Sequence, residues 1–243
     1  MDSGSDGSTR RFRRLLLKLS GEVLMGPEPF GYHPGTVDRL AHEVAEVASL
    51  GVQLGLVIGG GNLFRGVSTV GRQFERAQAD TVGMLATVMN GLVFQDALGR
   101  AGVPARVMTA LEMPRVAETF VRREAIAHLE AGRVVIFSAG TGHPYFSTDT
   151  GAVLRALEIG ADAIVKGTKV DGVYSADPVT DPSATRYETI RYREVLDRGL
   201  KVMDAAAVAL CMDNGLPLHV FNIRTPGNLP ALARGRELGT RVW

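Results

Sequence analysis

The segment VIGGGNLFRG, residues Val57 to Gly66, joins the end of an apolar run to three consecutive glycines. The run from Leu54 to Ile58 is typical of a buried strand. Three glycines in a row are entropically costly in a folded chain, so this turn needs backbone without side chains. The usual reason is close approach of backbone N–H groups to an anion, most often phosphate. Arg65 adds a permanently charged donor. The segment therefore predicts a phosphate site, and phosphate transfer is the first hypothesis.

The spacing of these glycines differs from two common nucleotide-binding motifs. The chain contains no Gly-Lys dipeptide, so the Walker A pattern is absent. Phe64 stands where the pattern GxGxxG requires its third glycine. The alternative to a phosphate site is a tight turn that needs a positive φ, although one glycine usually suffices for that.

Apolar runs of strand length alternate with helical patterns along the chain. This alternation indicates an α/β fold with a mainly parallel sheet. The predicted strands are Leu15–Leu19, Leu54–Ile58, Ala105–Met108, Val134–Ser138, Ala163–Lys166 and Leu218–Phe221. The predicted helices are Val37–Leu50, Thr81–Leu98, Ala125–Leu129, Val153–Ile159 and Ala205–Met212.

The polar, glycine-rich start of the chain predicts a disordered N-terminal tail over residues 1–12. Residues 13–243 predict a single domain, because no repeat or proline-rich linker divides them. A formal net charge of +1 argues against a dedicated nucleic-acid binder. No apolar run approaches the roughly 18 residues of a membrane span, so we expect a cytoplasmic protein. The single cysteine, Cys211, lies in an apolar helical stretch and predicts an inert buried thiol.

Four polar loops that contain glycine follow the predicted strands. They begin at Lys18, Gly59, Ala139 and Lys166. Ligands of parallel α/β sheets bind at the carboxyl ends of the strands, so we expect these loops to form one site. The ammonium group of Lys18 suits a phosphoryl group in transfer. The alternative is a lysine whose charged end reaches solvent from an edge strand.

The helix predicted from Thr81 leaves two alternatives for Asp80, which precedes it, and two for its own surroundings. Asp80 is favoured as its N-cap on pattern alone, and a carboxylate that binds ribose hydroxyls is the functional alternative. The helix is apolar on several faces, so it lies either in the core or against another subunit, and we favour the subunit.

The segment AGTGHPYFSTDTGA, Ala139 to Ala152, combines glycines and hydroxyl residues with a helix start that can hold an anion. Asp149 would repel phosphate directly, so it would hold Lys18 or another cation, or bind through Mg²⁺. Alternatively, Ser147 or Asp149 only caps the helix. TKVDGVYSADP, from Thr168, predicts an ordinary hairpin with a turn at Asp171-Gly172. Asp204 predicts a helix cap.

Together these segments resemble the amino acid kinase superfamily. KLSG (Lys18 to Gly21), the GGGN turn and TKVDGVYSADP carry this resemblance in that order. VIGGGNLFRG, GMLATVMNGL, SAGTGHPYFSTD and KVMDAAA are similar to the bacterial UMP kinase (uridylate kinase) family within it. The resemblance implies a three-layer αβα sandwich around a mainly parallel sheet. It also implies transfer of the ATP γ-phosphoryl group to UMP in pyrimidine nucleotide (CTP) biosynthesis.

The resemblance further implies roles for individual residues. It implies that Asp80 binds a nucleotide instead of capping a helix, and that the predicted hairpin binds a nucleotide and is not purely structural. The implied catalytic residues are Lys18, Arg65, Asp149 and Asp204, with Mg²⁺ arriving with ATP and no separate protein metal site. The implied ATP-binding residues are Lys18, Leu19, Ser20, Gly21, Gly61, Arg65, Thr168, Tyr174 and Asp177. The implied UMP-binding residues are Gly60, Asp80, Thr141, Gly142, His143, Pro144, Tyr145, Phe146, Ser147 and Thr148.

The resemblance also implies regulation and assembly. It implies a homohexamer that GTP activates and UTP inhibits. The implied GTP-responsive residues are Gly26, Pro27, Glu28, Pro29, Phe30, Gly31, Arg106 and Arg133.

Two rival functions stay open at this point. The first is a kinase of the same fold that phosphorylates an acidic amino acid or carbamate, which would not need Asp80 or the GTGHPYFST loop. The second is a non-catalytic nucleotide sensor or anion-storage assembly, in which we would expect Lys18 or Arg65 to be lost.

Overall fold

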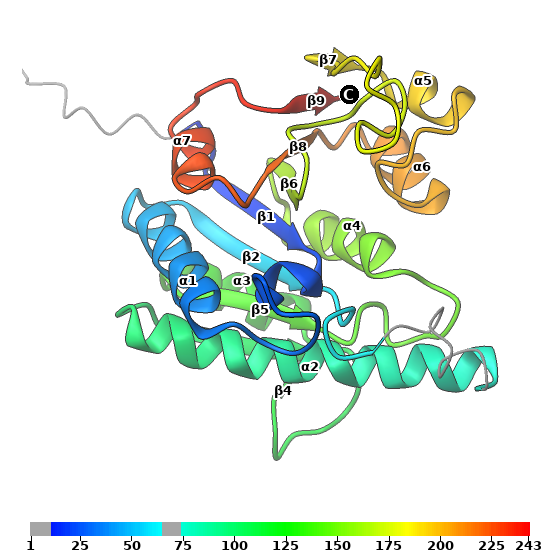
Figure 1. The fold of residues 1–243 in the computed structure, drawn as a ribbon. Helices are drawn as coiled ribbons and strands as arrows, with labels where there is room; N and C mark the ends of the chain where they lie inside the picture. Colours follow the sequence, from blue (N-terminus) through cyan, green and yellow to red (C-terminus); the bar gives the residue numbers. More distant parts are fainter. Residues whose placement is uncertain (1–10, 65–73) are drawn as a thin grey trace, which may run out of the picture.

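A computed structural model describes residues 11–64 and 74–243, and its centre is one twisted sheet (Figure 1). Neighbouring strands pair in parallel, except β8 and β9, which are antiparallel. The predicted mainly parallel sheet is therefore confirmed. The order across the sheet is β4 (Glu118–Thr119), β3 (Ala105–Thr109), β5 (Val134–Ser138), β2 (Gln53–Ile58), β1 (Arg14–Leu19), β6 (Ala163–Thr168), β8 (Leu218–Asn222), β9 (Thr240–Val242) and β7 (Thr189–Ile190).

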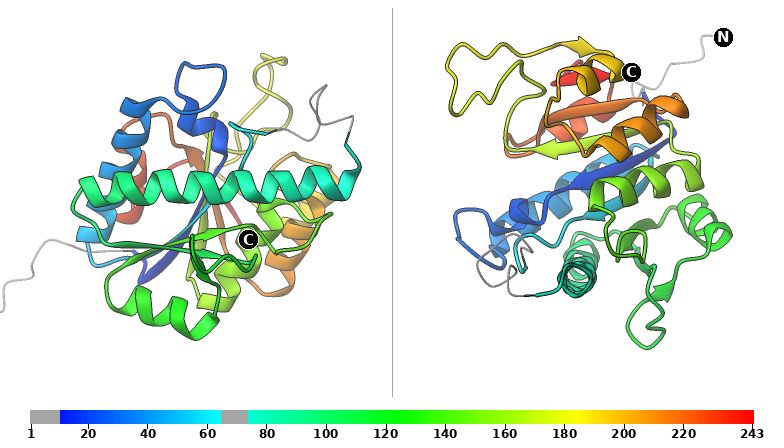
Figure 2. Two further views of the ribbon diagram at one scale, coloured as in Figure 1. Left: turned by 90° about the horizontal axis from the view of Figure 1, so that it is seen from below. Right: turned by 90° about the vertical axis from the view of Figure 1, so that its right-hand side faces the viewer.

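Helices cover both faces of this sheet, so the fold is the expected three-layer αβα sandwich (Figures 1 and 2). One face carries the 3-10 helix η1 (Gly21–Met25), α1 (Pro34–Ser49), α2 (Arg76–Arg100) and α7 (Asn228–Ala233). The other carries α3 (Arg122–Glu130), α4 (Thr148–Ile159), α5 (Tyr192–Asp197) and α6 (Ala205–Asp213).

The central strand β1 shows how the sheet divides the core. All of its residues are buried, as a strand covered on both faces requires. Leu15, Leu17 and Leu19 pack into the core beneath α1, whereas Leu16 packs beneath α4. Alternation along the strand places Lys18 on the same face as Leu16. The lysine therefore faces α4.

The six predicted strands and five predicted helices are all present, with small shifts at their ends. The largest shifts are at the starts of α2, which begins at Arg76 rather than Thr81, and of α4, which begins at Thr148 rather than Val153. The elements that the sequence did not predict are short: β4, β7, β9, η1, α5 and α7. The described chain begins at Arg11, and Phe12 is buried against His219, so packing starts before residue 13. The tail prediction otherwise concerns residues 1–10, which lie outside the described part.

Helix α2 lies along the sheet on the α1 side (Figure 2). Among the described helices it alone is long and apolar enough, by length and composition, to cross a membrane. Its Asn90, Phe94 and Leu98 are buried in the fold, while Leu85 and Met89 are 45% and 53% exposed. The helix thus belongs to the core on one side and presents apolar side chains to the surface on the other.

Candidate active site

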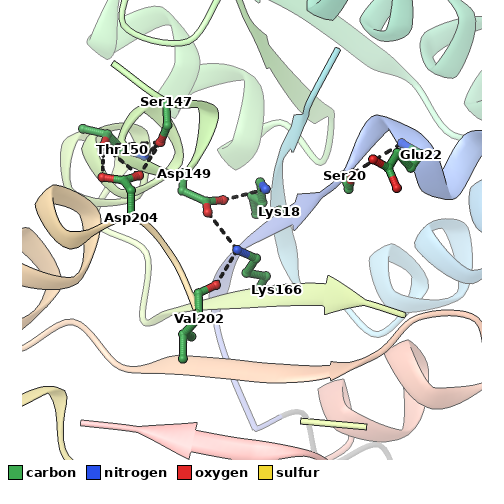
Figure 3. Close-up of polar contacts among 9 residues, drawn as sticks. All are labelled: Lys18, Ser20, Glu22, Ser147, Asp149, Thr150, Lys166, Val202 and Asp204. Carbon is green, nitrogen blue, oxygen red and sulfur yellow. Dashed lines mark hydrogen bonds and ion pairs between the residues drawn. The ribbon is translucent and has the colours of Figure 1, made fainter. Parts of the chain in front are cut away.

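Two lysines and one aspartate meet where β1 and β6 approach the start of α4 (Figure 3). Lys18 and Lys166 are partners in the parallel register of these strands. Lys18 Nζ lies 2.5 Å from Asp149 Oδ1, and Lys166 Nζ donates to Asp149 Oδ2 at 2.8 Å. Lys166 also donates to the carbonyl oxygen of Val202 at 2.6 Å. We call Lys18, Asp149 and Lys166 the lysine–aspartate cluster.

Burial and charge act against each other in this cluster. Burial alone would raise the pKa of Asp149, but the ammonium groups of Lys18 and Lys166 outweigh it and hold that pKa below its usual value. Burial, helped by the charge of Lys18, lowers the pKa of Lys166 despite Asp149. Two cations therefore share one fixed anion, and such a group is suited to stabilising an added phosphoryl charge.

Asp204 joins the first turns of two helices beside the cluster (Figure 3). As predicted, it is the N-cap of α6, where it accepts from the N–H of Ala207 at 3.1 Å. It also accepts from the hydroxyl groups of Thr150, at 3.0 Å, and Ser147. Ser147 itself caps α4 by accepting from Thr150 N–H at 3.1 Å. Of the two predicted caps of this helix, Ser147 is therefore confirmed and Asp149 is wrong.

The glycine turn, Gly59 to Gly61, does not need left-handed backbone. All three residues have φ values outside that region, so a tight turn with positive φ is the wrong explanation for them. A Cβ on Gly60 would lie 2.8 Å from both the Gly83 carbonyl oxygen and Ala86 Cβ, so α2 requires that glycine. Among the described residues, Cβ atoms on Gly59 and Gly61 would meet nothing closer than 3.5 Å. Packing within the described part of the chain therefore explains only the middle glycine.

The KLSG loop packs directly on the glycine turn. A Cβ on Gly21 would lie 2.2 Å from the carbonyl oxygen of Gly59, so only glycine allows this approach. Ser20 caps η1 by accepting from Glu22 N–H at 3.4 Å (Figure 3). The KLSG loop and the glycine turn, which were both predicted to bind phosphate, are therefore neighbours. Arg65, predicted for the same place, lies outside the described residues.

A cavity of about 570 Å³ opens between the glycine turn, the first part of α2 and the loop before α4. Eight of the ten residues predicted to bind UMP line it: Gly60, Asp80, Thr141, His143, Tyr145, Phe146, Ser147 and Thr148. Gly142 and Pro144 belong to the same loop. Arg76, Met84 and Thr87 also line the cavity, and the sequence reasoning did not select them.

Asp80 does not cap a helix, because α2 begins four residues earlier at Arg76. Its carboxylate instead accepts from Arg76 Nε at 2.8 Å and from the backbone N–H of Tyr145 at 2.7 Å. Tyr145 has a φ of 72°, an uncommon value for a residue with a side chain. Asp80 therefore ties the loop before α4 to α2 at the cavity wall.

A second cavity, of about 460 Å³, lies between β6, the segment after it and the loop before α6. Thr168, Tyr174 and Asp177, the residues predicted for the adenine nucleotide, all line it. Tyr174 pairs with Arg186 in an antiparallel bridge, so the predicted hairpin is present; Asp171 and Gly172 form a bend before it, and the chain reverses between Tyr174 and Arg186. Residues 198–202 also line the cavity and were missed.

The residues implied in the GTP response do not meet within one chain. Gly31 is held beside the glycine turn, because its N–H donates to the Asn62 carbonyl oxygen at 3.0 Å. Arg106, near the start of β3, pairs with Glu118 at 3.1 Å. Arg133 precedes β5, so both arginines lie at the amino edge of the sheet. The segment 26–31 follows η1 at the carboxyl edge.

Two carboxylates lie in or beside the lysine–aspartate cluster, those of Asp149 and Asp204. Within residues 11–64 and 74–243, no group of three or more His, Cys, Asp or Glu side chains is placed to hold a metal ion. Mg²⁺ is commonly bound by one or two carboxylates together with substrate phosphates. These two carboxylates therefore fit an ion that enters with a nucleotide.

Lys166 is the clearest site residue that the sequence reasoning missed. In the sequence it marks only the start of a loop. The available signal was the one that singled out Lys18, a lysine at the end of an otherwise apolar strand. The strand register that pairs the two lysines comes only from the structure.

The chain belongs to the amino acid kinase family, which its sequence matches over residues 13–222. Solved structures place it more narrowly, among the UMP kinases of that family. The UMP kinase of Bacillus anthracis is 36% identical with a TM-score of 0.92, and the match covers 96% of each chain. The UMP kinase of Ureaplasma parvum is 35% identical with a TM-score of 0.89, over 96% of this chain and 99% of that one. The uridylate kinase of Archaeoglobus fulgidus is 28% identical with a TM-score of 0.74, over 94% and 99% of the two chains.

Proposed function

We propose that this protein transfers the γ-phosphoryl group of ATP to UMP, giving UDP and ADP. The observation that carries the proposal is the lysine–aspartate cluster adjoining two cavities. Asp149 lies between Thr148 and Thr150, which line the first cavity, and Lys166 binds Val202 of the second. The first cavity would take UMP and the second the adenine nucleotide, in keeping with the UMP kinases that this chain resembles.

The reaction requires neutralisation of phosphate charge and does not require a general base. A phosphate oxygen of UMP, already ionised near neutral pH, attacks the γ-phosphorus of ATP. The bond between that phosphorus and the β,γ-bridging oxygen breaks, and the electron pair leaves with ADP. Because two anions must meet, catalysis consists mainly of positioning and electrostatic stabilisation. Lys18, Arg65 and the backbone N–H groups of the glycine turn would supply it.

Asp149 would keep Lys18 in place for this step, and Asp204 would keep the first turns of α4 and α6 together. These two carboxylates would also hold Mg²⁺ that arrives with ATP. When bound, the ion would neutralise phosphate charge. The roles rest on the contacts of Asp149 with both lysines and of Asp204 with Ser147 and Thr150.

The remaining properties follow from the family resemblance. We propose that the enzyme acts in the cytoplasm, in pyrimidine nucleotide (CTP) biosynthesis. GTP would activate it through residues 26–31, Arg106 and Arg133, and UTP would inhibit it. The separation of these residues within one chain supports a GTP site completed by a neighbouring copy. The exposed Leu85 and Met89 of α2 support the proposed homohexamer.

A coupled assay of ADP release tests the proposal with UMP, CMP and glutamate as acceptors, each with and without GTP. We expect ADP release with UMP, far less with CMP and none with glutamate. Preference for glutamate would favour the acidic amino acid kinase. No ADP release with any acceptor, despite nucleotide binding, would favour the non-catalytic sensor.

A further inference from the structure

Two asparagine side chains form a buried reciprocal pair behind the glycine turn. Asn62 follows the turn and is 1% exposed, and Asn90 lies on α2 and is fully buried. Asn90 Nδ2 donates to Asn62 Oδ1 at 2.8 Å, and Asn62 Nδ2 donates to Asn90 Oδ1 at 3.1 Å. Burying two amides is costly unless their groups are hydrogen-bonded, so this pair has a specific geometry to maintain.

The pair is connected to the glycine turn. Asn90 Nδ2 donates to the carbonyl oxygen of Gly59 at 2.6 Å. A trans peptide is planar, so fixing this carbonyl group also fixes the opposite direction of the Gly60 N–H. The pair therefore orients a backbone donor of the turn without reaching a ligand itself.

The same pair is connected to the KLSG loop and to the segment 26–31. A Cβ on Gly21 would lie 2.4 Å from Asn62 Oδ1, so that loop rests against the pair. Asn62 Nδ2 donates to the Gly31 carbonyl oxygen at 3.1 Å, and Gly31 N–H donates back to the Asn62 carbonyl oxygen at 3.0 Å. Phe30, next to Gly31, is 65% exposed. A surface segment is thus linked to the turn by a short chain of buried and partly buried hydrogen bonds.

We propose that Asn62 and Asn90 are positioning residues that set the backbone of the glycine turn and couple it to segment 26–31. The inference rests on the proposed function in one respect, that the glycine turn faces nucleotide phosphate. A contact made at segment 26–31 then changes the turn through Asn62. Conversely, a nucleotide bound at the turn steadies segment 26–31.

Hydrogen exchange and steady-state kinetics of the full-length protein test this coupling. Asn90→Ala removes the donor to Gly59 and the partner of Asn62, and Asn62→Ala is a second variant in case the first does not fold. Thr87→Val is the matched control. Thr87 lies one turn earlier on α2, is 5% exposed at the wall of the first cavity, and accepts from the N–H of Ala139 instead. UMP binding to each protein is measured separately by calorimetry.

In the wild type, we expect UMP with a non-hydrolysable ATP analogue to slow exchange of the amides of residues 26–33. Asn90→Ala should abolish this slowing and lower kcat about tenfold, the effect of one buried hydrogen bond, with KM for UMP nearly unchanged. Thr87→Val should retain the slowing at 26–33 and raise KM for UMP.

The outcomes separate the two proposals. Wild type that binds UMP but shows no slowing at 26–33 would overturn the coupling alone. Asn90→Ala and Asn62→Ala variants that fold, keep the slowing and keep kcat would overturn it as well. A wild type that binds no UMP would contradict the proposed function itself.

Discussion

At the scale of single residues, the central feature is one carboxylate shared by two ammonium groups. Asp149 holds Lys18 and Lys166 at neighbouring positions of adjacent strands. Without the aspartate, two buried like charges would repel each other and lose their only fixed counter-ion in the cluster. With it, ion pairs to one carboxylate hold both lysines in place, an arrangement suited to stabilising an added phosphoryl charge.

Replacing Lys18 tests this directly. We expect Lys18→Ala to lower kcat by between two and three orders of magnitude, roughly 3–4 kcal/mol of lost charge stabilisation. The measurement is UMP-dependent ADP release at saturating substrates. Arg193→Ala, which removes an exposed cation on α5, is the control and should leave kcat unchanged. Near-normal turnover by Lys18→Ala would show that this ammonium does not face the transferring group.

Asp80 should affect binding more than chemistry. Asp80→Ala leaves the N–H of Tyr145 without its acceptor and removes the carboxylate from the wall of the first cavity. We expect KM for UMP to rise at least about tenfold, the effect of one or two hydrogen bonds to a charged group, with a smaller change in kcat. An unaltered KM for UMP, with KM for ATP raised instead, would assign Asp80 to the other nucleotide.

At the scale of elements, long periodic segments could be predicted and short ones could not. β1 and β5 are mostly apolar and are buried on both faces, and hydrophobic pattern alone locates them. β4 and β7 contain two residues each, which is too short for any periodicity. Their pairing depends on the neighbouring strand, so the sequence carries no local signal for them.

The same distinction applies to the site. The loops after β1, β2 and β5 could be predicted, because glycines and charges follow apolar strands there. The contact of Asp80 with Tyr145 joins residues 65 positions apart, and that of Lys166 with Val202 joins residues 36 apart. Such contacts are set by tertiary packing. The start of α2 was missed for a related reason, since Glu75 makes no side-chain cap that a pattern could reveal.

The exposed side of helix α2 can be tested for a role in assembly. Leu85 and Met89 are one turn apart and present apolar surface. If copies of the chain pack there, Leu85→Glu with Met89→Glu should bury repelling charges and shift the protein toward smaller species. Light scattering after size-exclusion chromatography measures this. An unchanged molar mass would mean that this face of α2 takes no part in assembly.

At the scale of the whole molecule, His219 on β8 links stability to pH. Burial, helped by the charges of Arg11 and Arg241, lowers its pKa from 6.5 to about 4, with Glu237 opposing. A lowered pKa means that the unfolded chain binds the proton more tightly, so the stabilising contribution is complete above pH 6.5 and is lost as pH falls through about 4.

Urea unfolding between pH 7.5 and 4 measures this contribution. The wild type should lose roughly 3 kcal/mol more than His219→Leu over that range, since one pKa unit corresponds to about 1.4 kcal/mol. Parallel pH profiles of the two proteins would mean that His219 does not titrate differently on folding.

The proposed reaction requires two nucleotides to meet across the lysine–aspartate cluster. Phosphorus NMR of purified protein with ATP, Mg²⁺ and UMP observes the reaction itself, without coupling enzymes. We predict that the γ-phosphate signal of ATP falls while the signals of UDP and ADP rise in equal amounts, and that omission of UMP stops the change. ATP and UMP that persist unchanged beside folded, nucleotide-binding protein would contradict the account.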